Sequence, residues 1–588
     1  MGTARTRAWP ALALPVVITG LTLFGLLQYG DTLRLPLVGD DWFFIDKTRH
    51  LSWATVWAPR DLVPAYYRPW SRELHYGVLQ RIAGASGTPF RIANLGLWLG
   101  VMALYFALVR RLAGTRVAGV ATAATAALAG WGVLLVWPAG AQDLWMLLFA
   151  LLFLHGFARR RALPALAALA LALLSKESAA VLPAIAFAYA WTVDGSSPGA
   201  ALRRVAPGLA LVAAWAMFHP LIGGRLWGAP QGVPPFAEHV SAVAAALRTL
   251  LASFDLDALP APDDDWSMVV ARGILGAALL AGLTALALRP GPAHAGAERR
   301  GAASARAERA TASAEAAHPR APRPAIAPVL RFGAAWAIIA WLPLARPGLG
   351  WHAYYTLLGS LGAWLAIAAL LASRPRLALA TVALLPMLRA ARAATFADDW
   401  GTEWYQRRAG RLVAVMKRDL LERHASFPPG SRVFLADLPG GVSLVAGPGN
   451  SPALKAWYRE PALWVAFLSQ FRARGPHDPP GRDYFFVGRE NGSWNELVVG
   501  PEDVSARRVF PQWSDYHQNL ADVLYRGGDL RGALAESEKL AEAMPERFEF
   551  ALNAGVCARA LGDTAAASRW FARAAAAQRS VSGSKANE

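Results

Sequence analysis

The sequence predicts an α-helical polytopic membrane protein with about 11 spans, a C-terminal soluble α/β segment and helical repeats. Of its 588 residues, 55% are hydrophobic and 17% are charged, whereas about a quarter of a soluble protein is charged. The apolar residues form runs of about twenty, the length that a helix needs to cross ~30 Å of hydrocarbon. Near the C-terminus, a pattern of residues recurs with a fixed period.

The apolar runs give the spans in order. The first run, Trp9–Tyr29, follows Arg5 and Arg7, has no evident cleavage site, and is expected to remain as a membrane anchor. The other ten expected spans are Ile92–Val109, Val117–Trp137, Leu144–Phe157, Leu163–Leu174, Ala179–Trp191, Val205–Ile222, Met268–Leu288, Leu330–Leu344, Tyr354–Ala372 and Leu377–Ala394.

Arginine placement predicts the orientation. Arginines gather in every second loop, as at Arg159–Arg161 and Arg203–Arg204, which predicts that these loops and the N-terminus are cytoplasmic. An odd number of spans then places the C-terminal domain in the periplasm or outside the cell, with the protein in the inner (plasma) membrane. The net charge of +18 arises largely from these loops, so nucleic acid is excluded as a partner.

The remaining segments complete the expected organisation. Arg432–Leu438 and Tyr484–Gly488 predict short buried strands. Asn519, Gly528, Asp529 and Ala533 recur 34 residues later, a period that resembles tetratricopeptide (TPR) helix pairs. The expected regions are 1–29, N-terminal segment and first span; 30–90, first outer loop; 91–288, spans two to eight with outer loop 223–267; 289–328, disordered cytoplasmic linker; 329–396, last three spans; 397–513, soluble outer domain; and 514–580, repeats.

The strongest candidate for chemistry is the acidic pair Asp40 and Asp41, shortly after the first span. Adjacent carboxylates repel one another, which raises a pKa. Such a pair can accept a proton from an attacking hydroxyl, hold a divalent metal or bind the hydroxyls of a sugar. The alternative is a solvated turn or a helix cap.

Two further groups of residues are candidates on the same side. Tyr67 and Arg68 precede Pro69-Trp70, and an arginine fork matches phosphate oxygens. On this motif alone, an interfacial aromatic belt with a snorkelling arginine is the better explanation. Lys176 and Glu177 lie between two apolar runs, where a charged side chain is costly. Either they are functional, with the lysine binding a lipid phosphate, or they simply form an ion pair in a tight outer turn. Weaker candidates at the outer ends of spans are Gln142, Asp143, His219, Asp263–Asp265, His352 and Tyr355.

Together, these residues resemble a family. An acidic pair after the first span, a long outer loop with Tyr-Arg-Pro, and a Lys-Glu pair at a short outer turn are similar to the GT-C superfamily of glycosyltransferases. The repeats after the membrane part resemble the transmembrane and TPR-repeat-containing O-mannosyltransferases. The chain has Asp-Asp where members often have Asp-Glu, so the choice between Asp40 and Asp41 stays open, and it lacks the Trp-Trp-Asp-Tyr-Gly run of oligosaccharyltransferases.

The resemblance implies a reaction and its participants. A hexosyltransferase would move a sugar from a polyprenyl-phosphate donor to a hydroxyl of a protein, glycan or lipid acceptor on the outer face, without metal or cofactor. Asp40 or Asp41 would be the base, and Arg68 and Lys176 would bind the donor phosphate. The donor or acceptor pocket would include Tyr67, Glu177, His352 and Tyr355, and the TPR repeats suggest a peptide or protein partner.

Two other functional classes compete with this interpretation. A polytopic transporter or lipid flippase is disfavoured because the spans show no clear internal repeat and no acidic residue deep in the membrane. A non-catalytic membrane scaffold that presents the TPR repeats would make the acidic pair dispensable.

Overall fold

The structure, a computed structural model, describes residues 9–57, 66–219, 242–257, 266–288, 326–345, 351–395, 399–436, 438–440, 442–471, 474, 480–489, 491–496, 511–543, 545 and 547–584. The candidates Asp263–Asp265 and most of the predicted linker 289–328 therefore lie outside the described residues. The chain divides into two compact units, Met1–Gly410 and Arg411–Glu588.

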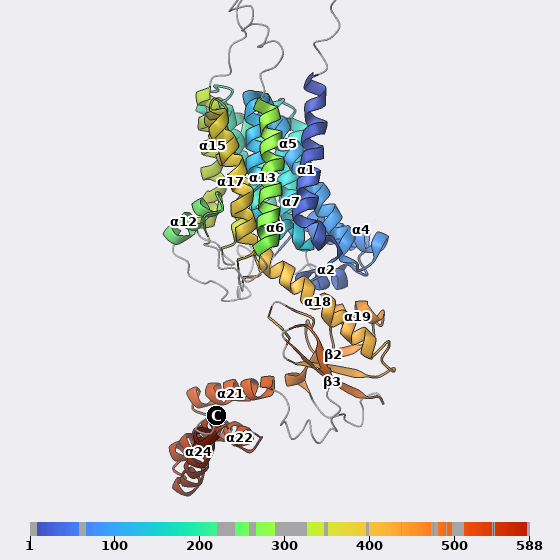
Figure 1. Ribbon diagram of the computed structural model, residues 1–588, viewed down its shortest axis with the longest axis vertical. Helices are drawn as coiled ribbons and strands as arrows, with labels where there is room; N and C mark the ends of the chain where they lie inside the picture. Colours follow the sequence, from blue (N-terminus) through green and yellow to red (C-terminus); the bar gives the residue numbers. More distant parts are fainter. Residues whose placement is uncertain are drawn as a thin grey trace, which may run out of the picture. The chain divides into compact units, whose positions relative to one another are not determined.

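The first unit is a bundle of long apolar helices that lie side by side (Figure 1). Among the described residues, seven helical stretches are long and apolar enough to cross a membrane, which confirms the predicted polytopic class. The bundle helices are α1 (Trp9–Tyr29), α5 (Gly87–Ala126), α6 (Gly130–Val136), α7 (Ala141–Ala158), α8 (Ala162–Leu173), α9 (Leu182–Thr192), α10 (Pro198–Phe218), α13 (Trp266–Leu288), α15 (Ile326–Trp341), α16 (Leu357–Leu371) and α17 (Pro375–Ala393).

Every predicted span overlaps at least one of these helices, but their lengths differ from the prediction. The two expected spans 92–109 and 117–137 share α5, which is broken at Gly114, where φ is 83°. Only glycine adopts this conformation readily, so α5 is two helices joined at that residue. The expected spans 163–174 and 179–191 correspond to α8 and α9, of 12 and 11 residues. Each is too short to cross ~30 Å alone, because a polar turn at Lys176 interrupts the apolar run.

The predicted first outer loop contains short helices. They are η1 (Gly30–Arg34), α2 (Asp40–Thr48), α3 (Trp53–Val56), η3 (Pro69–Leu74) and α4 (His75–Ala83). Figure 1 shows α2 and α4 at one end of the bundle. Helix α2 begins after Gly39, whose φ of 52° allows the chain to turn. It packs against η3, α4 and η4 (Pro138–Gly140), the short turn that precedes α7.

The second unit opens with a small sheet. Helix α18 (Glu403–Arg423) leads into it, and the strand order is β2-β1-β3-β4, with β1 (Arg432–Ala436) parallel to β2 (Trp464–Phe467) and β3 (Asp483–Gly488). Strand β4 (Trp494–Glu496) is antiparallel to β3, and α19 (Pro452–Tyr458) connects β1 to β2. The two predicted strands are confirmed as β1 and β3, whose residues are mostly buried.

Four helices follow as two hairpins: α21 (Pro511–Arg526), α22 (Leu530–Ala543), α23 (Phe548–Ala560) and α24 (Thr564–Ser584). The 34-residue period reappears in their turns. Gly528 and Gly562 have φ values of 82° and 83°. In each turn, the following aspartate caps the next helix: Asp529 accepts from the Gly532 amide at 2.9 Å, and Asp563 from the Ala566 amide at 2.8 Å. The assignment of these hairpins as TPR repeats stays a prediction.

Candidate active site

The two carboxylates of the acidic pair have different surroundings. Asp41 is fully buried and accepts three hydrogen bonds. They come from the Tyr76 hydroxyl at 2.6 Å and from the backbone amides of Val38 and Ala139, each at 3.0 Å. Burial raises the pKa of Asp41 to about 7, although these hydrogen bonds oppose the shift. Repulsion from Asp40 contributes least among the causes, so burial, rather than crowding, dominates here.

Asp40 is exposed, and its carboxylate has no hydrogen bond or ion pair to any residue that the structure describes. The surrounding protein nevertheless removes enough water to raise its pKa above the ordinary value, while the Arg72 guanidinium opposes this shift. Adjacent residues on a helix point about 100° apart, because a turn holds 3.6 residues. This geometry directs Asp41 inward and leaves Asp40 accessible to a ligand.

A buried polar cluster forms around Arg68, which lies immediately before η3. Its Nε donates to both oxygens of Glu177 at 3.0 Å, and its Nη1 donates to Gln142 Oε1 at 2.7 Å. Glu177 also contacts His219, whose Nε2 lies 3.2 Å from Oε1. Burial raises the pKa of Glu177, but the Arg68 guanidinium and the hydrogen bonds to Glu177 together outweigh burial and hold this pKa well below the usual range. These four residues come from distant segments of the chain.

Lys176 extends the cluster. Its Nζ lies 2.6 Å from both carboxylate oxygens of Asp143, in the first turn of α7. It also lies over the rings of Tyr354 and Tyr355, 5.2 and 4.7 Å from their centroids. Burial lowers the pKa of Lys176, and Asp143 opposes that shift. The cluster therefore holds two cations and two carboxylates beside two aromatic rings.

The short turn η4 connects this cluster with the acidic pair. Asp41 holds the amide of Ala139, and Gln142 Nε2 donates to the carbonyl of the same residue at 3.2 Å. The other end of the Gln142 side chain accepts from Arg68. Since α2 also packs against η3, Asp40 and Arg68 lie on adjoining elements at one end of the bundle.

Two other predicted residues, His352 and Tyr67, differ in their relation to the Arg68–Lys176 cluster. His352 stacks on Tyr354, with 5.7 Å between ring centroids, and its Nδ1 is 3.1 Å from Asp399 Oδ2. It borders the cluster through that tyrosine. The Tyr67 hydroxyl donates to the Trp57 carbonyl at 3.2 Å, so the described hydrogen bond of Tyr67 is with the residue that follows α3 rather than with the charged cluster.

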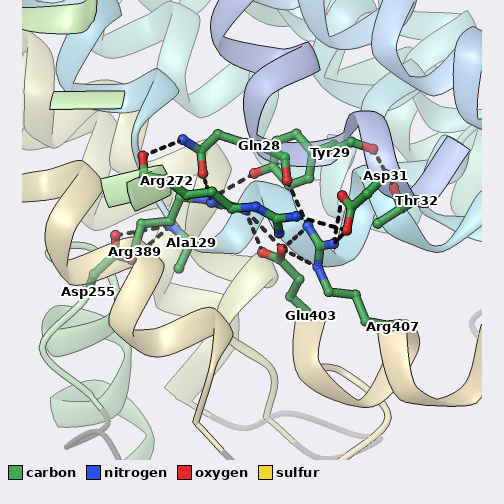
Figure 2. A network of polar contacts seen from close by, with 10 residues as sticks. All are labelled: Gln28, Tyr29, Asp31, Thr32, Ala129, Asp255, Arg272, Arg389, Glu403 and Arg407. Carbon is green, nitrogen blue, oxygen red and sulfur yellow. Dashed lines mark hydrogen bonds and ion pairs between the residues drawn. The ribbon is translucent and has the colours of Figure 1, made fainter. Parts of the chain in front are cut away.

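A second buried network was not predicted. Figure 2 shows Glu403 between Arg389 and Arg407, which donate to it at 2.8–2.9 Å. Arg407 also pairs with Asp31, and Arg389 donates to the hydroxyl of Tyr29 at 3.2 Å. The network joins α1, η1, α17 and the first turns of α18. The sequence contained one indication of this network, because Arg389 lies within an apolar run, where a charged side chain is costly.

Within the described residues, no group of three or more His, Cys, Asp or Glu side chains lies close enough to hold a metal ion.

No protein-family model matches the sequence, and no curated protein is similar to it. Two crystal structures are similar in fold, both of ArnT from Cupriavidus metallidurans. The apo structure has a TM-score of 0.35 and 17% identity, and the structure bound to undecaprenyl phosphate has 0.34 and 16%. Each match covers 82% of this chain and 93% of the other. Because these TM-scores are below 0.5, the likeness has no weight for the chemistry, which must come from the residues of this chain.

Proposed function

We propose that this multi-pass membrane protein is a GT-C-type glycosyltransferase, which moves a hexose from a polyprenyl-phosphate donor to an acceptor hydroxyl on the outer face of the membrane. The observation that supports it best is the juxtaposition of an accessible carboxylate, Asp40, with a buried cluster that holds Arg68 and Lys176 at the same end of the bundle. A phosphate ester and an attacking hydroxyl need these two kinds of group.

The proposed reaction assigns one task to each group. The Asp40 carboxylate takes the proton of the acceptor hydroxyl while the hydroxyl oxygen forms a bond to the anomeric carbon. The bond between that carbon and the phosphate oxygen breaks, and the polyprenyl phosphate leaves with its negative charge. Arg68 and Lys176 stabilise that charge. The raised pKa of Asp40 makes it a better proton acceptor than an ordinary aspartate.

Asp41 has a positioning role in this proposal. Its three hydrogen bonds fix the start of α2 and the turn η4, and thereby orient both Asp40 and Gln142. Tyr354, Tyr355 and His352 would border the donor, while Glu177 and Asp143 hold the two cations in place. The acceptor, on a protein, glycan or lipid, would approach from the outer face of the membrane.

The decisive experiment uses Asp40→Asn, which keeps the size of the side chain and removes its basicity. Transfer of a labelled sugar from a polyprenyl-phosphate donor should fall by about 10²–10⁴-fold. The matched control is Asp46→Asn on the same helix, which should leave transfer unchanged. If Asp40→Asn transfers sugar at the normal rate, the base assignment is wrong. If purified protein moves lipid across vesicles but transfers no sugar, it is a flippase.

The phosphate assignment has its own test. Lys176→Met removes a buried charge that would contact the donor phosphate, and a hydrogen bond to a charged group contributes about 1.5–3 kcal/mol. The KM for the donor should therefore rise by about 10- to 100-fold, whereas the KM for the acceptor should not change. Lys47→Met, at an exposed position on α2, is the control. An unchanged donor KM would exclude Lys176 from the phosphate site.

A further inference from the structure

An apolar groove lies beside the charged cluster, between α4, α5 and α7. It has a cavity volume of about 480 Å³, within the range that holds a small ligand. Trp70 and His75 line it from η3 and α4, Trp145 and Leu148 from α7, and Gly96 and Gly100 from α5. A side chain at Gly96 would meet nothing within 4 Å. The missing side chains along α5 therefore create the space of the groove.

One polar atom in this apolar lining has no hydrogen-bond partner among the described residues. His75 is only 8% exposed, and its Nδ1 accepts a hydrogen bond from Trp145 Nε1 at 3.2 Å. Because Nδ1 is an acceptor, the proton of the neutral ring is on Nε2. Nε2 is buried, and no described residue accepts its hydrogen bond. A buried donor without an acceptor is unfavourable, so this atom points to a ligand with an acceptor oxygen.

The charge of the His75 ring indicates which kind of acceptor oxygen the ligand would have. Burial lowers the pKa of His75 to about 4, so the ring is uncharged at neutral pH. A neutral donor suits a carbonyl oxygen, whereas a phosphate is better matched by the cations of the neighbouring cluster. A hydrocarbon chain of isoprene units has no oxygen along its length and would leave the Nε2 proton unpaired.

The depth of the groove agrees with a lipid chain. At 1.5 Å per residue, Gly96 and Gly100 lie about 14 and 20 Å along α5 from its start at Gly87. His75 lies nearer that start, since its ring is 6.1 Å from Phe90. Val78 and Ile82 on α4 are 45% and 76% exposed, so α4 presents apolar surface that a lipid chain could cover. A chain in the groove would thus have its polar end at His75 and its tail near Gly100.

We infer that this groove binds one acyl chain of a lipid, whose ester or amide carbonyl accepts a hydrogen bond from His75 Nε2. The site is independent of sugar transfer, because it uses neither Asp40 nor the charged cluster. It would distinguish acyl lipids from lipids with the same tails but no carbonyl.

The test is a titration of the full-length protein, in detergent, by native mass spectrometry with two phosphatidylglycerols of equal chain length. One has ester-linked chains and the other has ether-linked chains without carbonyls. The wild-type protein should bind the ester about fivefold more tightly, the effect of one net hydrogen bond. His75→Phe should abolish this preference, and His75→Gln, which keeps an N–H donor at a similar position, should retain it.

Filling the groove gives a second measurement that does not depend on His75. Gly96→Leu should weaken binding of both lipids at least tenfold, while Gly282→Leu, at another helical glycine with nothing within 4 Å, should leave it unchanged. Equal binding of ester and ether by the wild type, or a preference that persists in His75→Phe, would overturn the inference. It would also be overturned if Gly96→Leu weakened binding of a polyprenyl phosphate but not of phosphatidylglycerol, since the groove would then hold an isoprenoid chain.

Discussion

Replacing each aspartate of the acidic pair by alanine should separate stability from catalysis. Asp41→Ala leaves three buried donors without their acceptor: the Tyr76 hydroxyl and the amides of Val38 and Ala139. Each unsatisfied buried group costs about 1–3 kcal/mol, and a water that enters the vacated space can satisfy one of them. With two groups left unsatisfied, we expect the free energy of unfolding to fall by about 2–6 kcal/mol. Asp40→Ala removes no hydrogen bond among the described residues and should change it by less than about 0.5 kcal/mol.

The assay is unfolding of the purified protein by SDS titration in mixed micelles, followed by tryptophan fluorescence, together with sugar transfer by the same preparations. The expected pattern is a stable, inactive Asp40→Ala and a destabilised Asp41→Ala. Equal stability of the two variants would refute the reasoning, because it would mean that the three hydrogen bonds to Asp41 contribute nothing. Normal transfer by Asp40→Ala would refute its role as the base.

Three further results are expected. Burial raises the pKa of Asp41 to about 7, so the protonated carboxyl contributes stability that is complete below about pH 4 and is lost as the pH rises through 7. The free energy of unfolding of the wild type, relative to that of Asp41→Asn, should therefore fall between about pH 4 and pH 7. An increase over this range would contradict the raised pKa. A Cβ at Gly132 would lie 1.9 Å from Glu403 Oε2, so Gly132→Ala should lower the thermal midpoint by the equivalent of about 1–3 kcal/mol, whereas Gly282→Ala should not. Gly562→Ala places a side chain at a φ of 83° and should lower the stability of this helical hairpin by about 1–2 kcal/mol. Amide hydrogen exchange in α23 and α24 should then be faster than in the wild type, and unchanged exchange would exclude strain at this turn.

The membrane helices could be predicted because hydrocarbon imposes a simple requirement on sequence. Every backbone polar group must be paired within the segment, so runs of apolar residues become helices, and α1 has the bounds that the first run predicted. The break in α5 was also visible, since three arginines flank Gly114 and mark the turn there. The strands β1 and β3 were predicted for a related reason: both are short, buried and apolar.

The site was harder to predict, because it depends on contacts between distant segments. Arg68 was identified in the first outer loop and Lys176 between two apolar runs, but their pairing with Glu177 and Asp143 appears only in the structure. The sequence could not distinguish Asp40 from Asp41, since neighbouring residues of one type differ only in the direction that the helix gives them. The Glu403 network was missed because the sequence of α18 is typical of an ordinary polar helix. Burial of its first turns depends partly on Gln28 and Asp31, which lie more than 370 residues away from Arg407.

The charges of the Arg68–Lys176 cluster have a consequence for selectivity. Arg68 and Lys176 are balanced by Glu177 and Asp143, so the cluster offers little net attraction to a dissolved anion, which would also have to loosen both carboxylates. A phosphate attached to a lipid in the same membrane is at a far higher local concentration. We therefore expect inorganic phosphate to compete poorly with a lipid-borne phosphate, so that the cell's soluble phosphate pool would not inhibit the proposed sugar transfer.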